Sequence, residues 1–178
     1  MEIRPPADAP TSTQTLGAEE IRRTPGGFED VLKAVALLPG VSASNAARND
    51  LVVRGGAPQE NLFVLDGIEI PNLNHFGSQG STGGPVSLIN VDLVREARFS
   101  AGGFGVRYGD RIGSVTDLTL REGNGERMAG NVNLSSTGFS GVIEGPVGGG
   151  ATFVASARRS FLDLIFNLAN FPFLPRYY

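Results

Sequence analysis

The 178-residue sequence contains no cysteine and a single histidine, His75. Without cysteine there can be no disulfide framework, no thiolate zinc site and no cysteine nucleophile. A lone histidine without a carboxylate cluster does not predict a metal site, and no Gly-x-Ser-x-Gly elbow accompanies it. No carboxylate pair suited to acid–base catalysis is indicated. We therefore expect no catalytic residues, no metal and no cofactor, and we predict that the chain is not an enzyme.

Long charged or apolar runs are also missing. The net charge is −3 and no basic run exceeds two residues, which argues against a nucleic-acid partner. No stretch reaches the roughly 20 apolar residues of a membrane helix, because the longest candidate, residues 161–174, contains Asp163 and Pro172. The N-terminus lacks the apolar segment of a signal peptide, so an exported protein with this sequence is expected to be an internal fragment.

Apolar residues and glycine, in contrast, are abundant. A hydrophobic fraction of 40% supports a packed core rather than a disordered chain. The 25 glycines follow no period, which is typical of a chain with many turns, bulges and close backbone approaches.

The N-terminal part predicts a linker followed by helices. Residues 1–14 contain three prolines and favour an extended linker. Residues 18–23 predict about one turn of helix, and residues 28–38 predict a longer helix that ends at Pro39-Gly40. Glu29 and Asp30 are expected in its first turn, where they complement the helix dipole. The apolar face of this helix is formed by Val31, Leu32, Val35 and Leu38.

Residues 51–121 change to a period of two, which predicts strands. The expected strands cover residues 51–54, 61–65, 68–70, 96–100 and 114–121. Asp66-Gly67 lies between two apolar runs and predicts a hairpin, because both central residues of such a turn need positive φ. A loop rich in Gly, Ser and Asn is expected from Pro71 to Pro85, and Asn90 is expected to cap a short helical turn.

The sequence beyond residue 123 alternates between polar and apolar residues. Strands are expected at 131–135, 139–144 and 152–158, with a turn at 146–150. Such alternating segments of about 10 residues with short turns are typical of transmembrane β-barrels. In the third strand the expected lipid-facing residues are Phe153, Ala155 and Ala157, and the expected lumen-facing residues are Thr152, Ser156 and Arg158. Val154 is an exception to this alternation.

Five short motifs follow one another between residues 15 and 123. They are Leu37-Leu38-Pro39-Gly40-Val41, Val53-Arg54-Gly55-Gly56, residues 63–70 (FVLDGIEI), residues 89–97 (INVDLVREA) and residues 102–110 (GGFGVRYGD). In this order they resemble the plug domain of TonB-dependent outer-membrane receptors, in the form found in Bacteroidetes-type bacteria. The strand at 112–118 and the long loop at 72–80 depart from the commonest pattern of that family.

The resemblance implies an α+β fold. Residues 15–123 would form the plug, a small mixed sheet with short helices, and residues 124–178 the first antiparallel strands of a truncated transmembrane β-barrel. The plug would lie inside the barrel of a receptor in the outer membrane of a Gram-negative bacterium, reached from the periplasm. A barrel of about 22 strands has a lumen wide enough to need such a plug.

The function implied by the resemblance is energy-coupled uptake of a substrate such as a siderophore, a vitamin or a glycan. The implied partners are TonB, the rest of the barrel, the transported small molecule and the outer membrane. TonB would pair with a short extended box near the N-terminus. Residues 1–15 contain no convincing box, so we expect it upstream. In the implied mechanism, substrate binding shifts the population of plug conformations and exposes the box.

Three groups of residues are candidate sites. The surface of the plug that contacts the barrel is expected to include Arg54, Arg95 and Glu96. The loop after the hairpin is expected to face the ligand, because loops carry binding more often than frameworks do, through Asn72, Asn74, His75, Phe76 and Gln79. The residues expected to form structural turns are Gly55, Gly56, Asp66 and Gly67.

Two other interpretations compete with this one. Residues 103–109 have the spacing GxGxxxG, but a strand rather than a helix is expected next, so the helix N-terminus that would hold a phosphate is missing. A free-standing β-rich module for ligand binding or adhesion is the remaining alternative. It is disfavoured because the apolar segment 171–175 would be an exposed patch on such a module.

Overall fold

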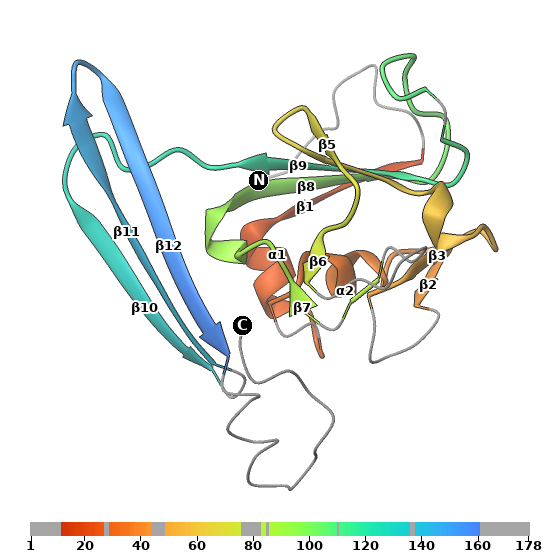
Figure 1. Ribbon diagram of the computed structural model, residues 1–178, viewed down its shortest axis with the longest axis horizontal. Coiled ribbons are helices and arrows are strands. Elements are labelled where there is room, and N and C mark those ends of the chain that lie inside the picture. The colour runs from red at the N-terminus through yellow and green to blue at the C-terminus, as the bar shows by residue number, and fades with distance from the viewer. Residues whose placement is uncertain are drawn as a thin grey trace, which may run out of the picture. The chain divides into compact units, whose positions relative to one another are not determined.

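The computed structural model describes residues 12–26, 29–43, 49–75, 83–84, 86–109, 111–135 and 138–160. The chain divides into two compact units, Met1–Arg121 and Glu122–Tyr178 (Figure 1). Each unit has a sheet of its own. No helix in the described part of the chain combines the length and the apolar character needed to cross a membrane.

A five-stranded mixed sheet with the order β1-β8-β9-β4-β5 organises the first unit. All neighbouring strands are antiparallel except β4 and β9, which run parallel. The strands of this sheet are β1 (Thr13–Gly17), β4 (Leu62–Leu65), β5 (Ile68–Ile70), β8 (Val94–Ser100) and β9 (Val115–Leu120). Two short ladders accompany it, β2 (Val41–Ala43) with β3 (Leu51–Val53) and β6 (Asn74–His75) with β7 (Val86–Ser87). The helices are α1 (Ala18–Arg23), α2 (Val31–Val35) and the 3-10 turns η1 (Pro58–Glu60) and η2 (Val91–Leu93).

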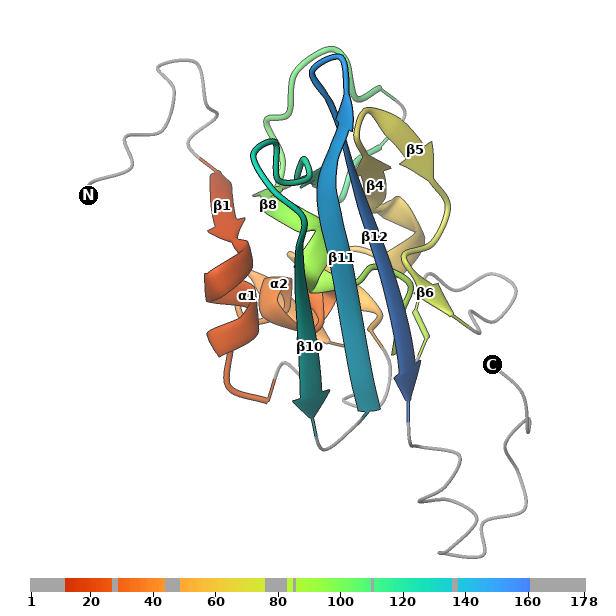
Figure 2. The same cartoon turned by 90° about the vertical axis from the view of Figure 1, so that its left-hand side faces the viewer.

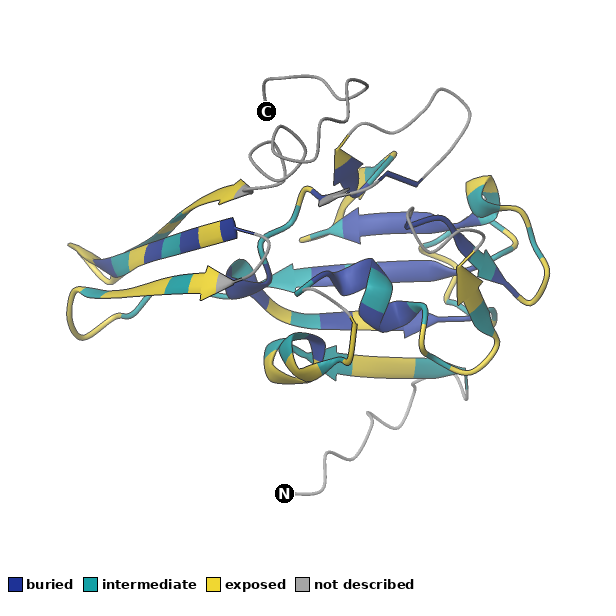
Figure 3. Ribbon diagram, turned by 90° about the horizontal axis from the view of Figure 1, so that it is seen from below, coloured by how far each residue is buried: buried dark blue, intermediate teal, exposed yellow. Residues whose placement is uncertain are grey.

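The main core lies between one face of this sheet and the two helices (Figure 3). The register places Phe63, Phe99 and Leu118 on this face, where all three are at most 1% exposed. The helices contribute Ile21, Val31, Leu32 and Val35, which are buried to the same degree. Each such side chain stabilises the fold by roughly 1.5–3 kcal/mol relative to an exposed one, so this layer is the main source of stability.

The opposite face of the sheet is covered by the glycine-rich segment that follows β8. Leu62, Val64 and Val115 are buried there, and Phe104 and Tyr108 pack against them. The sheet therefore has an apolar layer on each side, with helices over one face and an irregular segment over the other.

Helix α2 is shorter than the sequence predicts, whereas α1 has the predicted bounds. Asp30 is the N-cap of α2, and its side chain accepts hydrogen bonds from the amides of Leu32 (2.8 Å) and Lys33 (3.4 Å). Glu29 has a φ of 56° and lies outside the helix. The expectation that Glu29 and Asp30 both occupy the first turn is therefore wrong, because Asp30 is a capping residue with extended backbone and the helix begins only at Val31.

Strands β4 and β5 meet across Asp66 and Gly67, whose φ values are 48° and 83°. Positive φ at both central residues is the geometry of a two-residue hairpin turn. The Asp66 amide also donates to Leu118 O (2.9 Å), and the Asp66 side chain accepts from the Leu120 amide (2.9 Å). The hairpin is thus fixed to β9 as well as closed on itself.

The second unit contains a three-stranded antiparallel sheet of β10 (Ala129–Ser135), β11 (Gly138–Gly148) and β12 (Ala151–Ser160). The strands lie side by side in sequence order (Figure 2). Gly149 and Gly150 join β11 to β12, and both have positive φ.

Three segments differ from the sequence-based expectation. β1 starts at Thr13, inside the expected linker, and pairs along its whole length with β8. The expected loop at 71–85 contains β6, which pairs with β7 just after the loop. Pro146 lies within β11 rather than in a turn, and the register shift between Pro146 and Gly148 is a bulge of the kind that accommodates proline in a strand.

Candidate functional site

The turn after β3 places Arg54 at one end of the sheet. Arg54 and Gly55 have φ values of 50° and 81°, and the Arg54 amide donates to Gly40 O (2.9 Å). A Cβ on Gly56 would lie 3.2 Å from Val53 O, so this position also favours glycine. The Arg54 side chain is exposed and passes Gly102, where a Cβ would lie 3.4 Å from Nη1.

Asn61, which the sequence analysis did not single out, connects three strands at the same end. Its Nδ2 donates to Leu51 O (2.7 Å) and its Oδ1 accepts from Ser114 Oγ (2.8 Å). The Leu62 amide donates to Ser114 O (2.8 Å), so the starts of β4 and β9 are held together beside β3. The only signal in the sequence is that Asn61 is a polar residue directly before the apolar strand 62–65.

Arg95 and Glu96 lie at the other end of β8 from Gly102. The register shifts between Val94 and Glu96, and Arg95 is exposed at that irregularity. Glu96 forms an ion pair with Arg98 (2.9 Å) on the same strand. Exposed pairs of this kind contribute about 0–1 kcal/mol, so Glu96 and Arg98 have little effect on stability. The structure does not bring Arg54 and Arg95 together.

The expected ligand-facing loop divides into exposed and buried residues. His75 is exposed and Asn72 is half-buried, whereas Asn74 is only 4% exposed. Asn74 therefore does not face a ligand, because its side chain is committed to a hydrogen-bond network inside the unit. Phe76 and Gln79 lie outside the described residues.

Asn74 belongs to a network of four polar side chains, Asp30, Asn49, Asn72 and Asn74, which we call the Asn49 junction. All of them are buried except Asn72, which is half-buried. Asn49 Nδ2 donates to Asp30 Oδ2 (2.6 Å) and to Asn74 Oδ1 (2.9 Å). Asn72 Oδ1 accepts from the amide (2.9 Å) and from the side chain (3.2 Å) of Asn74. The junction links the N-cap of α2 to the residue that begins β6.

Burial raises the pKa of the Asp30 carboxyl above its ordinary value of 3.8, against the opposing effect of hydrogen bonds from Asn49 and from the Leu32 and Lys33 amides. The folded state then binds the proton more tightly than the unfolded chain does, so Asp30 makes the free energy of unfolding fall as pH rises from 3.8 through the raised pKa.

We expect the difference in unfolding free energy, wild type minus Asp30→Asn, to fall over that window and to be constant above it. Urea titrations of both proteins at a series of pH values measure this difference. A difference that rises with pH would contradict the burial effect.

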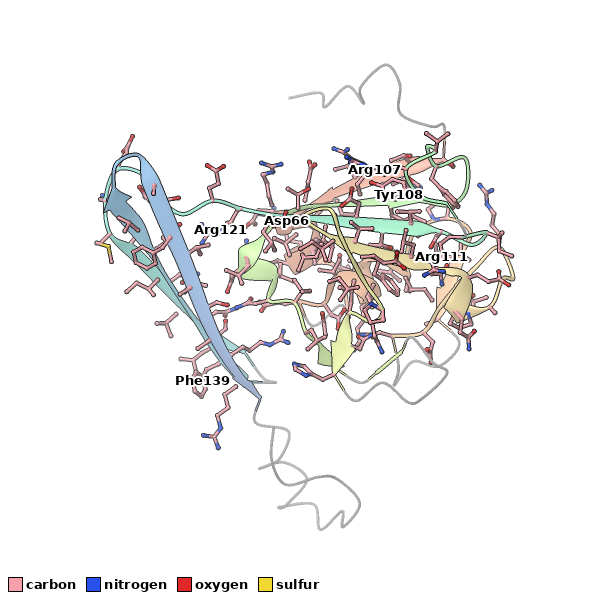
Figure 4. All side chains as sticks on the ribbon, turned by 45° about the horizontal axis from the view of Figure 1, so that its top comes forward. Asp66, Arg107, Tyr108, Arg111, Arg121 and Phe139 are labelled. Carbon is pink, nitrogen blue, oxygen red and sulfur yellow. The ribbon has the colours of Figure 1, made fainter. Side chains whose placement is uncertain are left out.

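Two polar contacts hold the glycine-rich segment on the face of the sheet opposite the helices (Figure 4). Tyr108 Oη donates to Asp117 Oδ2 (2.8 Å), and Arg111 Nη2 donates to Glu69 Oε1 (2.5 Å). Burial raises the pKa of the Tyr108 phenol, and the contact with Asp117 raises it further while Arg107 acts in the opposite direction. Tyr108 therefore stays protonated and donates to a carboxylate.

The sheet of the second unit has two chemically different faces. Residues paired in register share a face, which puts Val132 with Gly141, Leu134 with Phe139, and Ile143 with Ala155. The exposed fractions on this face are 74% for Val132, 76% for Leu134, 40% for Phe139 and 51% for Ile143. The opposite face carries Asn131, Asn133, Ser140, Glu144, Ser156 and Arg158, with Ala129, Val142 and Val154 as apolar exceptions. Arg159, which pairs with Phe139 near the end of β12, is the charged exception on the apolar face among these paired residues.

Comparison with known proteins identifies the first unit. Residues 5–115 match the family model described as the TonB-dependent Receptor Plug Domain. This chain belongs to that family. Two solved structures share its fold at 19% sequence identity. The ferric enterobactin receptor of Pseudomonas aeruginosa, as a mutant in complex with enterobactin, aligns with a TM-score of 0.59 over 84% of this chain and 24% of that receptor. The alcaligin outer-membrane receptor of Bordetella pertussis aligns with a TM-score of 0.58 over 88% of this chain and 28% of that receptor.

The chain therefore contains a TonB-dependent receptor plug and spans about a quarter of the length of these receptors. The predicted family and the mixed sheet with short helices are confirmed. Within the described residues, no group of three or more His, Cys, Asp or Glu side chains is placed to hold a metal ion. The polar residues of the plug instead connect its own segments, through Asn61 at one end and through the Asn49 junction at the base of the loop.

Proposed function

We propose that this plug closes the lumen of an outer-membrane receptor that imports a small molecule, with energy supplied by TonB. The family match supports the plug, and the sheet that follows it supports the receptor wall. The substrate is a siderophore, a vitamin or a glycan. Of the two similar receptors named above, one is a ferric enterobactin receptor in complex with enterobactin and the other is an alcaligin receptor. Transport requires binding and displacement of the plug rather than bond chemistry, so no residue of the chain has a catalytic role.

The observation that carries this proposal is the two-faced sheet of the second unit. Val132, Leu134, Phe139 and Ile143 expose apolar side chains on one face, and the other face is mainly polar. Alternation of this kind is typical of strands whose outer face meets lipid and whose inner face meets an aqueous lumen. We assign β10–β12 to the wall of a barrel, which covers an apolar face that a free-standing binding module would expose to water.

We assign contacts with the wall to Arg54 and Arg95, which extend from opposite ends of the plug sheet. Both are exposed, and carboxylates of a polar lumen would pair with them. Glu96 has Arg98 as a partner already, so it contributes less to this contact. On the ligand side we retain the exposed His75, together with Asn72, Phe76 and Gln79 of the same loop. Substrate binding at the loop shifts the population of plug conformations and exposes the TonB-binding segment.

Labelling of single cysteines, placed on one or the other face of the sheet, tests whether β10–β12 form the wall of a barrel. Because the sequence contains no cysteine, Ile143→Cys and Leu134→Cys on the apolar face can be compared directly with Ser156→Cys and Asn133→Cys on the polar face. In the protein assembled in an outer membrane, we expect a lipid-soluble maleimide to modify the first pair and a water-soluble one only the second.

The Gly150→Cys variant, at the turn between β11 and β12, serves as the control for reagent access. Equal modification of all four strand positions by the water-soluble reagent would show that the sheet lies in water. That result would favour the binding-module alternative over the receptor.

A further inference from the structure

The Asn49 junction joins two parts of the plug that are far apart in the sequence. Asp30 caps α2, whereas Asn74 begins β6 at the base of the loop. An amide nitrogen has two hydrogens, and Asn49 Nδ2 uses them on Asp30 Oδ2 and Asn74 Oδ1. The Asn49 backbone amide donates to Gly84 O (3.2 Å), where the chain returns toward β7. One residue therefore contacts the helix, the start of the loop and its return.

The loop side of the junction is closely packed. Asn74 is fixed from behind by Asn72, and the Leu88 amide donates to Leu73 O (2.7 Å) beside the two-residue β6–β7 ladder. A Cβ on Gly83 would overlap the carboxylate of Asp50, the residue after Asn49. A displacement of the loop base therefore changes the contacts of Asn49 and Asp50 directly.

The helix side of the junction depends on the same amide. Asp30 is 6% exposed and holds the amides of Leu32 and Lys33, in the first turn of α2, through one carboxylate oxygen, while its other oxygen accepts from Asn49. A buried carboxylate needs its donors, because a charge without hydrogen bonds is costly in the protein interior. Losing Asn49 therefore weakens the cap of a helix that has only five residues.

From this juxtaposition we propose that Asn49 is a positioning residue that couples the loop base at Asn74 to the N-terminus of α2. Displacement of Asn74 by a ligand on the loop withdraws an acceptor from Asn49, which then no longer holds Asp30 in its capping position. This inference rests on the proposed function only for the identity of the displacing ligand; the coupling itself is a property of the plug.

Native-state hydrogen exchange of the 178-residue chain, without substrate, tests the coupling. We expect Asn74→Ala to accelerate exchange of the Leu32, Lys33 and Ala34 amides about tenfold, the effect of one lost hydrogen bond to a charged network, with little change in β9. In an Asn49→Ala background the same substitution should cause no further acceleration. The proposal is overturned if α2 exchange is unchanged, or if Asn74→Ala has the same effect in both backgrounds.

Two additional measurements guard against a variant that does not fold. In Gly83→Ala, the added Cβ overlaps the Asp50 carboxylate, so the variant should displace the loop base and accelerate exchange of the same α2 amides. Asp66→Ala, in the hairpin away from the junction, should cause no selective acceleration of these amides. In the unaltered chain, the Asn49 amide and the first-turn amides of α2 should open with the same free energy as a function of urea. Different opening free energies would exclude a shared unit. The coupling and the proposed function are tested independently. If the exchange experiments contradict the coupling, the cysteine-labelling result is not affected. If the labelling shows that the strands lie in water, the coupling within the plug is not affected.

Discussion

Asn61→Ala is expected to lower the free energy of unfolding of the plug by about 3–5 kcal/mol. The substitution removes the donor to Leu51 O and the acceptor of Ser114 Oγ, in a place where Asn61 is 5% and Ser114 0% exposed. Each buried polar group that loses its partner costs about 1–3 kcal/mol, and the deleted side-chain volume adds to this. Chemical denaturation of the chain, followed by a signal from the first unit, measures the change.

Asn90→Ala is the matched control for Asn61→Ala. Asn90 is also an asparagine before a strand-forming segment, but its side chain makes one capping bond, from the Asp92 amide to Oδ1 (3.0 Å), and is only half-buried. Loss of such a cap costs about 1 kcal/mol. If both variants lost the same stability, Asn61 would be an ordinary cap rather than the connection between β3, β4 and β9.

Local sequence signals were sufficient where the structure is determined by near neighbours. Asp66-Gly67 forms its turn because both backbone positions take positive φ, a property of those residues themselves. The alternation in residues 152–158 predicted which side chains of β12 share a face, because side chains alternate along any strand. The order of five motifs predicted the plug family, which no single motif could have done.

Contacts between distant segments could not be predicted in this way. β1 carries only one large apolar residue, Leu16, and exists as a strand because β8 offers it a partner some 80 residues away in sequence. Asn74 looked like a loop residue exposed to ligand, and only its position beside Asn49 shows that it is buried. Asn61 and Asn49 share this property, since a buried amide and an exposed one are identical in the sequence.

The proposed placement of β10–β12 in a membrane wall predicts a large effect from a single charge. In the protein assembled in a lipid bilayer, Ile143→Arg is expected to lower the free energy of unfolding by about 2–4 kcal/mol, because the side chain would meet hydrocarbon near the middle of the strand. Urea titration of the protein in lipid vesicles measures the change. Ser156→Arg is the control at matched depth, because Ser156 pairs with Val142, the neighbour of Ile143, but lies on the opposite face.

Ser156→Arg should change the folding free energy little, since Arg158 already occupies that face of the same strand. The sign of the difference between the two variants therefore distinguishes three arrangements. A larger loss for Ile143→Arg places the apolar face against lipid, and a larger loss for Ser156→Arg would place it toward the lumen. Equal and small losses would mean that neither face meets hydrocarbon, as in a module that works in water. Only the first outcome is compatible with the proposed function, in which Arg54 and Arg95 would pair with a polar inner wall.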